Sequence, residues 1–598
     1  MCKALFGPFR QKASAPFFCP EVGRRGRCGT LLLVVLMVAL PLRLYVALRA
    51  ELISRDGAAF IWYAQNLRSD PAGELRAQKQ HPLYPVMVLA VHHVLEGLRG
   101  VIPGLPADPV KSWVLAAVAV TLAGGLAVVV GVYALTCVLF RVHPETLEKH
   151  RRDAGATYVG AGATPIVGCT VNGRVGLIAA LLAAVTAEFC QLSGDALTDM
   201  PHLAVFLLAL AAAIRGVRER SYGWLIVGGL LAGVAYLIRP EGAEVAVVTA
   251  VGVLFAARFG SLRRRMIGAL LVCMAAGAVA SPYMIVTGKL VPKKSLKQLF
   301  WGQADHQPRL TDPDSTSRRL QPARRFEGDG AFKCVRGTAR AEARGSLAGC
   351  LASIQADLGR GWARIAENWA RSLRVTLLLP AVLWLVYRRR RPCEVVGGRL
   401  VAGLIVLHVA ILACLIVHFD YLRLFSLRHV MVLAALTLPF SAAGIAIILD
   451  MVPAGRERLI MAALAAGLIG PTLPWMLETR YADGLHIRRA GEWIRRHDVY
   501  VPRIMTTLNQ AALYADGVQV WCPADLDPAW VLAEARQRRP TWMVFEEIRE
   551  PQEMQVFFDG LKKMLLPGEG LEREHETAGD GPQARRAVIF RYRPPGTR

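Results

Sequence analysis

The sequence predicts a polytopic α-helical membrane protein with about 11 transmembrane helices, because an apolar run of roughly 20 residues can cross the hydrocarbon core of a bilayer. Of the 598 residues, 54% are apolar, and the mean hydropathy is +0.35. Near residue 480 the long apolar runs give way to short strand-like and amphipathic segments. The C-terminal part therefore predicts a small soluble α/β domain.

The first span follows a basic N-terminal segment. Arg24, Arg25 and Arg27 precede the apolar run Thr30–Leu48, and no small-residue cleavage site follows it. We therefore expect an uncleaved span with its N-terminal end in the cytoplasm. Further spans are expected at residues 110–140, 174–193, 199–214, 222–238, 242–257, 266–287, 373–387, 399–418, 428–449 and 458–476.

The segment Pro82–Leu95 decides the orientation of every later span. It is short, contains Pro82 and Pro85, and ends in polar residues, which is typical of a helix lying along the membrane interface. If it does not cross, the basic loops share the cytoplasmic side, as the positive-inside rule requires; these loops are 141–152, 215–220, 258–265, 388–391 and 455–458.

This orientation divides the chain into three parts. They are a cytoplasmic segment 1–29, a transmembrane domain 30–480 and an outer domain 481–598. The transmembrane domain carries a first outer loop 49–109 and a long outer loop 288–372. Polar residues of unusual type gather on the outer face, so we expect an active or binding site there.

The net charge of +25 could indicate a protein that binds nucleic acid. In a membrane protein a basic excess is typical of cytoplasmic loops and of contacts with lipid headgroups, so we expect membrane lipids and no nucleic acid as partners. The 12 cysteines show no metal-ligand spacing, and neither a metal site nor a cofactor is predicted. Cys334 and Cys350 lie close enough in the long outer loop to form a disulfide, and the sequence leaves their pairing open.

The stretch Glu51–Leu98 is the strongest candidate for reactive groups. Asp56 follows the first span with Arg55 beside it, and His81 and Tyr84 come later in a His-Pro-Leu-Tyr-Pro motif. A polar, aromatic-rich excursion between spans is where a membrane enzyme would place a reactive carboxylate. The alternative is an ordinary interfacial loop.

Asp195 and Asp199 are four residues apart at the outer end of a span. On one helix they would share a face, and two like charges there cost energy unless something binds them. The alternative is a helix cap before Pro201. We favour a functional role, with Asp199 ahead of Asp195.

Basic residues at other outer turns are candidates for binding a phosphate. Arg239 and Glu241 interrupt a long apolar run, either as a plain turn or as a bidentate phosphate donor with its ion-pair partner. Lys293 and Lys294 open the long outer loop, where basic residues run against the positive-inside trend. Arg428 lies in a short outer turn and would stabilise a phosphate leaving group, or else be a helix-end charge that reaches the interface.

The C-terminal tail predicts an amphipathic helix at 485–498, strands at 503–508, 541–545 and 587–592, and helices at 527–538 and 551–564. It contains no GxGxxG motif, no P-loop and no catalytic set. We expect it to support the site or to recognise an acceptor.

Together these motifs resemble the polytopic glycosyltransferases of the GT-C fold that use polyprenyl-phosphate sugars, including protein O-mannosyltransferases (glycosyltransferase family 39) and lipid A aminoarabinose transferases. The resemblance covers roughly residues 30–480 and rests on Asp56, the motif at 81–85, Leu197–Asp199 and Leu237–Glu241 in this order on one face. One departure is Gly57, where many members of the family have Glu after the first-loop Asp.

The resemblance implies an inverting transfer of a monosaccharide from a polyprenyl-phosphate carrier to a protein, lipid or polysaccharide on the outer face of the inner (plasma) membrane. Asp56 would act as general base, with Asp199 as the second carboxylate. Arg239 or the outer lysines would stabilise the leaving phosphate. A transporter or flippase of a lipid-linked or anionic substrate is the alternative from another class. The sugar, the acceptor, the carrier length and the oligomeric state are not given by the sequence.

Overall fold

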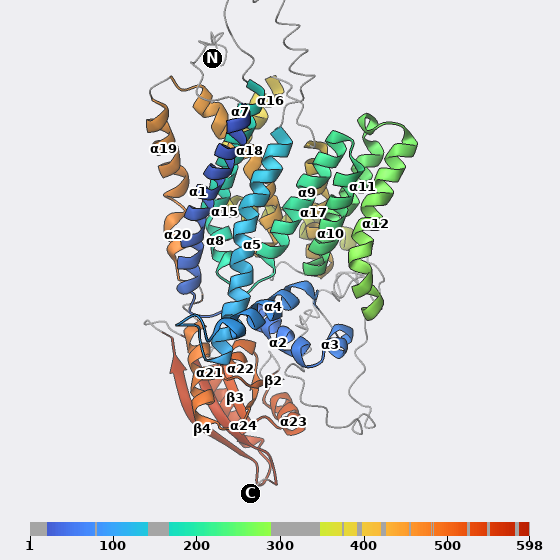
Figure 1. Cartoon of the computed structure of the whole chain (residues 1–598). Helices are drawn as coiled ribbons and strands as arrows, with labels where there is room; N and C mark the ends of the chain where they lie inside the picture. Colours follow the sequence, from blue (N-terminus) through green and yellow to red (C-terminus); the bar gives the residue numbers. More distant parts are fainter. Residues whose placement is uncertain are drawn as a thin grey trace, which may run out of the picture.

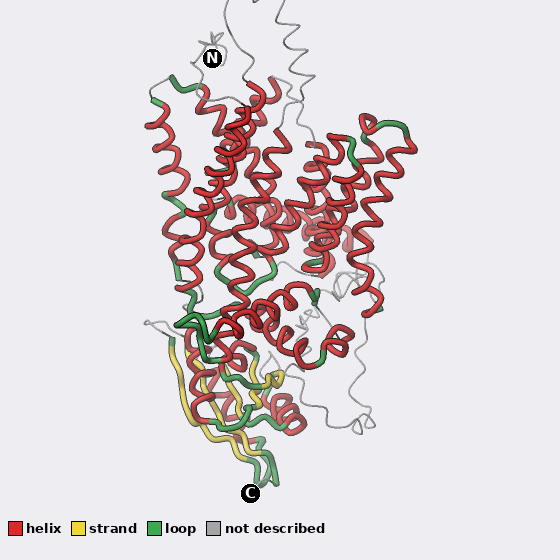
Figure 2. The backbone as a smooth tube through the Cα atoms, in the orientation of Figure 1, coloured by secondary structure: helices red, strands yellow, loops and turns green. Residues whose placement is uncertain are grey.

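The computed structural model describes residues 21–77, 80–140, 167–288, 347–373, 376–390, 398–419, 426–453, 456–479, 481, 484–522, 527–546, 551–579 and 585–596. A bundle of long helices forms one part of the molecule, and a small domain with a sheet lies against one end of it (Figures 1 and 2). We call this end of the bundle the domain side. The structure confirms the predicted class, a polytopic helical bundle with a small C-terminal α/β domain.

Within the described residues, five helices are long and apolar enough to cross a membrane: Gly29–Leu48 of α1 (Glu21–Leu48), α5 (Pro109–Phe140), α9 (Asp199–Glu219), α12 (Leu262–Thr287), and Leu427–Asp450, formed by η6 (Leu427–Val430) and α18 (Met431–Asp450). A sixth span results if α7 (Val167–Val185) and α8 (Ala187–Ser193), which are bent by 59°, are counted together. The expected total of eleven stays a prediction.

The other helices of the bundle are shorter or broken. They are α10 (Tyr222–Ile238), η1 (Pro240–Gly242), α11 (Ala243–Phe255), η2 (Ala257–Phe259), α15 (Leu347–Ser372), α16 (Leu378–Arg390), α17 (Gly398–Phe419), α19 (Glu457–Ile469) and α20 (Leu473–Leu477). The expected spans 174–193 and 458–476 are each interrupted, at Thr186 and before Leu473. Hydropathy alone does not reveal such breaks, because the residues on both sides remain apolar.

Three helices lie between the bundle and the sheet domain: α2 (Arg55–Ser69), α3 (Pro71–Ala77) and α4 (Leu83–Leu98) (Figure 1). The two ends of this segment contact the same helix of the small domain. Arg488 of α21 (Leu485–His497) donates to the backbone carbonyl of Glu51 at 2.9 Å, and Arg495 contacts Asp108 at 2.9 Å. The chain therefore enters and leaves on the domain side, and α4 does not cross, as the sequence predicts.

The small domain contains a five-stranded sheet in the order β2-β1-β3-β5-β4. The strands β1 (Arg503–Thr506), β2 (Val518–Trp521) and β3 (Trp542–Glu546) are parallel, whereas β5 (Arg586–Arg593) and β4 (Gly570–Ala578) are antiparallel. Helices α21, α22 (Asn509–Tyr514), α23 (Pro528–Arg538) and α24 (Pro551–Lys563) pack around it. The sequence analysis missed β2, β4 and α22, which are short or largely polar.

One apolar core joins the small domain to the interfacial helices. Ile61 and Trp62 of α2 belong to the same buried cluster as Ile487 and Ala490 of α21 and Ile589 of β5. Burial of such side chains is worth roughly 1.5–3 kcal/mol each. The sheet domain thus fixes the position of α2, the helix that carries Asp56.

Candidate functional site

Asp56 lies in the first turn of α2, on the domain side of the bundle. Ser54 precedes the helix in extended conformation, and its side chain accepts a hydrogen bond from the backbone N–H of Gly57 at 3.1 Å. Asn509 of the sheet domain donates to the backbone carbonyl of Arg55 at 2.8 Å. The helix start is therefore held from both sides, and a carboxylate in its first turn also interacts favourably with the helix dipole.

The side chain of Asp56 pairs with Arg428. Oδ2 of Asp56 accepts a hydrogen bond from Nη1 of Arg428, which lies in η6 at the start of α18, 372 residues further along the chain. The Asp56 side chain is 47% exposed, and that of Arg428 is 33% exposed. This pair is therefore open to a ligand.

A second pair lies deeper. Asp199, the first residue of α9, accepts from Nη1 of Arg239, and Arg239 also contacts the carboxylate of Glu241 at 3.4 Å. The Asp199 side chain is only 4% exposed. Arg239 ends α10, and its N–H bonds back to Ala235, so the turn into Pro240 presents the guanidinium at the helix end.

The two pairs form one cluster, which we call the arginine–carboxylate cluster: Asp56, Asp199, Arg239, Glu241 and Arg428. Arg428 interacts electrostatically with both aspartates and with Arg239. The cluster holds two guanidinium groups and three carboxylates contributed by α2, α9, η1, η6 and the end of α10. The structure thus brings together five of the residues that the sequence analysis singled out.

Gly57 explains why the chain departs from the Asp-Glu pattern. A Cβ atom at this position would lie 2.9 Å from both the Cβ atom and the backbone oxygen of Ala196. The first turn of α2 therefore packs against the turn before α9 with no space for a side chain. Asp199, which the sequence analysis named as second carboxylate, reaches the cluster from that neighbouring turn.

Asp195 serves a different purpose from Asp199. Its Oδ1 accepts from the backbone N–H groups of Ser54 and Ala196 at 2.9 and 2.8 Å, and its Oδ2 accepts from the hydroxyl of Tyr481 at 2.9 Å. It lies in the turn between α8 and α9, so the expected shared helix face with Asp199 is wrong. Its hydrogen bond from Ser54 holds the start of the first loop in place.

His81 and Tyr84 are buried beside the cluster rather than within it. The His81 ring packs edge-on against Tyr236 with 5.0 Å between centroids. The Tyr84 hydroxyl lies 3.1 Å from Oγ1 of Thr121, and the side chain is fully buried between α4 and α5. Both side chains pack the first loop against the bundle. Their role in substrate binding stays a prediction.

Some predicted residues cannot be placed. Lys293, Lys294 and Cys334 lie outside the described residues, and the side chain of Cys350 is not described. Among the described residues, no group of three or more His, Cys, Asp or Glu side chains is arranged to hold a metal ion.

Two buried ionisable residues behind the cluster were missed by the sequence analysis. Nδ1 of His408 in α17 lies 2.9 Å from Oε2 of Glu244 in α11, and Nε2–H donates to the backbone carbonyl of His429 at 3.2 Å. Both side chains are 4% exposed. Ionisable residues inside membrane helices are costly and rare, and this rule is the signal that could have found them.

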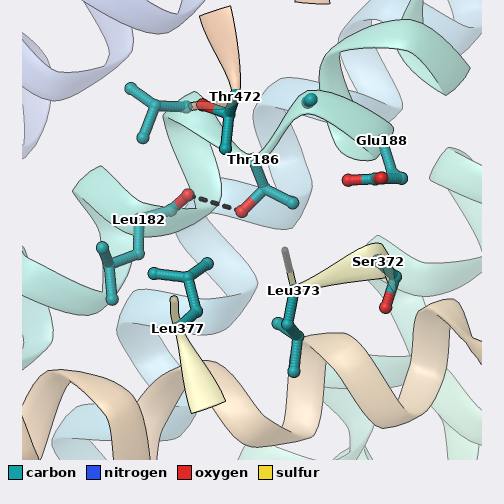
Figure 3. A pocket seen from close by; sticks show the side chains of 9 residues that line it. Leu182, Thr186, Glu188, Ser372, Leu373, Leu377 and Thr472 are labelled. Carbon is teal, nitrogen blue, oxygen red and sulfur yellow. Dashed lines mark hydrogen bonds between the residues drawn. The ribbon is translucent and has the colours of Figure 1, made fainter. Parts of the chain in front are cut away.

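Arg43 in α1 is a third missed residue, and it lies at the break between α7 and α8. Its guanidinium donates to the backbone carbonyls of Ala183 and Ala184 at 3.0 and 2.9 Å, and its side chain is fully buried. Thr186 bonds back to the carbonyl of Leu182 at 2.7 Å (Figure 3). Arg43 of α1 and Thr186 thus satisfy the carbonyl groups that the break frees, as a membrane interior requires.

A small cavity lies at this break. Glu188, Ser372 and Thr472 line it together with leucines from α7 and from the connection between α15 and α16 (Figure 3). The residues of the arginine–carboxylate cluster do not line it, so this cavity belongs to the interior of the bundle.

The cluster has the chemistry for handling an anionic group beside a base. Each guanidinium presents paired N–H donors that suit phosphate oxygens, and each now holds a carboxylate. A phosphate entering the site would compete for the same donors. Displacing Asp56 from Arg428 would leave an accessible carboxylate next to the bound anion.

Comparison with known proteins gives one family. Residues 162–285 match the model of the dolichyl-phosphate-mannose-protein mannosyltransferase family. The matched segment contains Asp195, Asp199, Arg239 and Glu241, so it supports the resemblance stated from the sequence over this part of the chain. No curated protein sequence matches.

Two solved structures of one protein are also similar to this chain. ArnT from Cupriavidus metallidurans in the apo state has a TM-score of 0.41 and 13% sequence identity, covering 95% of this chain and 98% of that chain. ArnT from Cupriavidus metallidurans bound to undecaprenyl phosphate has a TM-score of 0.40 and 14% identity with the same coverage.

Proposed function

We propose that the protein is a membrane glycosyltransferase that moves a monosaccharide from a polyprenyl-phosphate carrier to an acceptor. The observation that carries this proposal is the arginine–carboxylate cluster at one end of a membrane bundle, of which Asp199, Arg239 and Glu241 lie in the segment matched by the mannosyltransferase family model. The bundle gives the isoprenoid chain an apolar surrounding, and the cluster gives the phosphate two guanidinium groups.

In the proposed reaction Asp56 is the general base. It takes the proton from the acceptor nucleophile, which attacks the anomeric carbon from the side opposite the phosphate. The bond between that carbon and the phosphate oxygen breaks, and its electron pair stays on the polyprenyl phosphate, where Arg428 and Arg239 stabilise the charge. Attack from the opposite side inverts the anomeric centre. Asp56 is favoured over Asp199 because it is far more exposed.

We place the domain side on the outer face of the inner (plasma) membrane. Arginines at positions 215, 218, 220 and 263–265 lie at the helix ends away from the sheet domain, as the positive-inside rule requires of a cytoplasmic side. The acceptor, a protein or a glycolipid or polysaccharide, would then be met outside, with the sheet domain beside the site.

The test is consumption of a panel of polyprenyl-phosphate-linked sugars by the purified full-length protein. Asp56→Asn is expected to lower turnover by about 10²–10⁴-fold, the usual contribution of a positioned general base. Asp70→Asn is the matched control, because Asp70 flanks the same helix at its other end and its side chain caps only Gly73. It is expected to leave turnover unchanged.

Each other outcome has a definite meaning. Equal turnover by wild type and Asp56→Asn would keep the transferase and remove Asp56 as base. No turnover with any donor, together with movement of a lipid-linked substrate across vesicles, would replace the transferase by the transporter or flippase.

A further inference from the structure

We infer that Glu244 and His408 are positioning residues that set the separation of Arg239 and Arg428 for phosphate binding. This inference rests on the proposed function for its consequence, but its geometry is independent of it. The structure gives three links: a rigid turn beside Glu244, a two-sided contact of His408, and a short helix that carries Arg428.

The first link is the turn between α10 and α11. Arg239 ends α10, Glu241 follows in η1, and Glu244 lies in the first turn of α11. A Cβ atom at Gly242 would lie 2.3 Å from the backbone nitrogen of Tyr236, so the turn is packed against α10 without free space. The position of Glu244 is therefore fixed relative to that of Arg239.

The second link is the imidazole of His408. Its Nδ1 contacts both carboxylate oxygens of Glu244, at 2.9 and 3.2 Å, and its Nε2 contacts the backbone carbonyl of His429 at 3.2 Å. A carbonyl accepts only, so Nε2 carries a proton. One further proton lies between Nδ1 and the carboxyl group, and the ring cannot turn without losing both contacts.

The third link is η6. His429 follows Arg428 directly, and its ring accepts a hydrogen bond from the backbone N–H of Ser426 at 3.1 Å, closing a capping box. Val430 is fully buried against Ile365 and Leu412. The hydrogen bond from His408 joins this turn to α17 and, through Glu244, to α11, so it helps to set how far η6 lies from α11.

The distance between the two guanidinium groups matters because they would hold one phosphate. A displacement of a catalytic group by about 1 Å can lower the reaction rate by two orders of magnitude. Glu244 and His408 lie buried behind the cluster. Both interact electrostatically with Glu241, and Glu244 also with Arg239, whereas the hydrogen bond of His408 to the backbone carbonyl of His429 reaches the turn that carries Arg428. An effect on transfer that acts through Arg428 is therefore expected to disappear when Arg428 is removed, whereas an electrostatic effect on Arg239 or Glu241 would remain.

The first experiment is a double-mutant cycle on transfer by the full-length protein. His408→Leu and Glu244→Ala are each expected to lower the rate by roughly tenfold, whereas in an Arg428→Gln background they change it less than about twofold, since contacting residues couple and distant ones add. Glu244→Gln, which keeps a polar contact to Nδ1, is expected to restore most of the rate.

The matched control is a second buried Glu–His pair among the described residues. Nε2 of His486 in α21 lies 3.2 Å from Oε1 of Glu546 in β3. His486→Leu is expected to have the same relative effect with and without Arg428. If His408→Leu were additive with Arg428→Gln in the same way, a positioning role through Arg428 would be excluded.

The second experiment needs no activity. Asp56→Cys with Arg428→Cys places one thiol on each residue of the pair. Because cysteine is much shorter than arginine, a bifunctional thiol reagent of fixed span is used to join them, and the yield of the crosslink, mapped by mass spectrometry, reports where η6 lies. His408→Leu is expected to reduce this yield severalfold. A second thiol pair, Arg174→Cys with Asp450→Cys, replaces the 3.1 Å ion pair at the far end of α18 and is expected to be unaffected.

The two experiments separate the failures. If wild type transfers no sugar, the proposed function fails, and the crosslink yield still decides the positioning role. An unchanged yield at positions 56 and 428 would overturn it. If both crosslinks disappear in His408→Leu, the bundle itself is lost. His408→Phe, which keeps a planar ring but neither polar contact, is then used, and it must lower the first yield and preserve the second.

Discussion

In the arginine–carboxylate cluster every charged group faces another charged side chain, whereas at the break in α7 the guanidinium of Arg43 faces backbone carbonyls. Both regions lie in the bundle and both hold arginines that are largely or fully buried. A carboxylate that loses its arginine to a phosphate can be solvated or take up a proton. A backbone carbonyl inside a bilayer has no such alternative. The first region can therefore exchange partners, and the second must keep them.

The largest expected effect comes from removing Arg43. Arg43→Leu removes the arginine donor from the carbonyl of Ala183 and leaves that of Ala184 with the weaker thiol donor of Cys190 at 3.2 Å. It is expected to destabilise the bundle by about 1–3 kcal/mol, the cost of an unsatisfied buried group. Thermal unfolding of the full-length protein in detergent measures it. Arg49→Leu is the control at the same end of α1, because Arg49 is exposed and its guanidinium donates to the hydroxyl of Tyr45 rather than to a backbone carbonyl.

That experiment can also break the comparison. If Arg43→Leu kept the unfolding temperature of the wild type but lost transfer, the break between α7 and α8 would have a role in the reaction rather than in stability.

The same Asp→Asn change at Asp199 and at Asp195 compares a residue of the cluster with a residue that only braces the neighbouring turn. Asp199→Asn removes the charge that holds Arg239, and is expected to lower transfer by about 10–100-fold, the size of losing a charge-assisted hydrogen bond of ~1.5–3 kcal/mol. Asp195→Asn keeps an oxygen for the N–H groups of Ser54 and Ala196, and is expected to change transfer less than about threefold. Similar losses in both variants would mean that the turn acts as a unit.

The smallest expected effect lies in the sheet domain and depends on pH. Burial raises the pKa of Glu546, but hydrogen bonds from His486 and Arg585 outweigh burial and hold that pKa below its usual range. The resulting stability is present above the unfolded pKa of about 4.3 and is lost as the pH falls through the lower, folded value.

Amide hydrogen exchange of α21 in the full-length protein, corrected for the intrinsic effect of pH, is the measurement. As the pH falls below roughly 4.5, the opening free energy of α21 is expected to fall by about 1 kcal/mol or less. The effect is small because Arg585 is half-exposed, and solvent screens its ion pair with Glu546. Glu546→Gln should abolish this dependence, and a dependence that survives the change would point to another carboxylate. Glu569 is the next one to test, because Arg536, Tyr592 and a backbone N–H likewise hold its pKa low against burial.

Hydropathy predicted the membrane class, the main long spans and the interfacial path of α4, because these depend on the solvent that each stretch faces. Composition also identified the small domain and three of its strands. The candidate residues Asp56, Asp199, Arg239 and Arg428 were found singly, as polar residues where apolar ones are usual. Their pairing was not predicted, since Asp56 and Arg428 are 372 residues apart and only the tertiary fold brings them together.

What the sequence analysis missed has a common physical cause. Arg43, Glu244 and His408 lie inside apolar runs, where a window average hides one charged residue. Asp195 and Asp199 were assigned to one helix because hydropathy does not show that α9 begins at Asp199. The break between α7 and α8 depends on hydrogen bonds from Arg43 of another helix, which a local pattern does not contain. The break after α19 falls at Gly470 and Pro471, a local signal that the hydropathy of the segment hides.

The shared core of α2 and the sheet domain has a consequence for biosynthesis. Ile61 and Trp62, on the helix of Asp56, share one buried cluster with Ile487 and Ile589, so this core is complete only after the ribosome has made strand β5. Until then, neither the helix that bears Asp56 nor its contact with Arg428 has its final support. A chain in which Ile589 has not yet been made therefore lacks part of the core that supports the helix of Asp56.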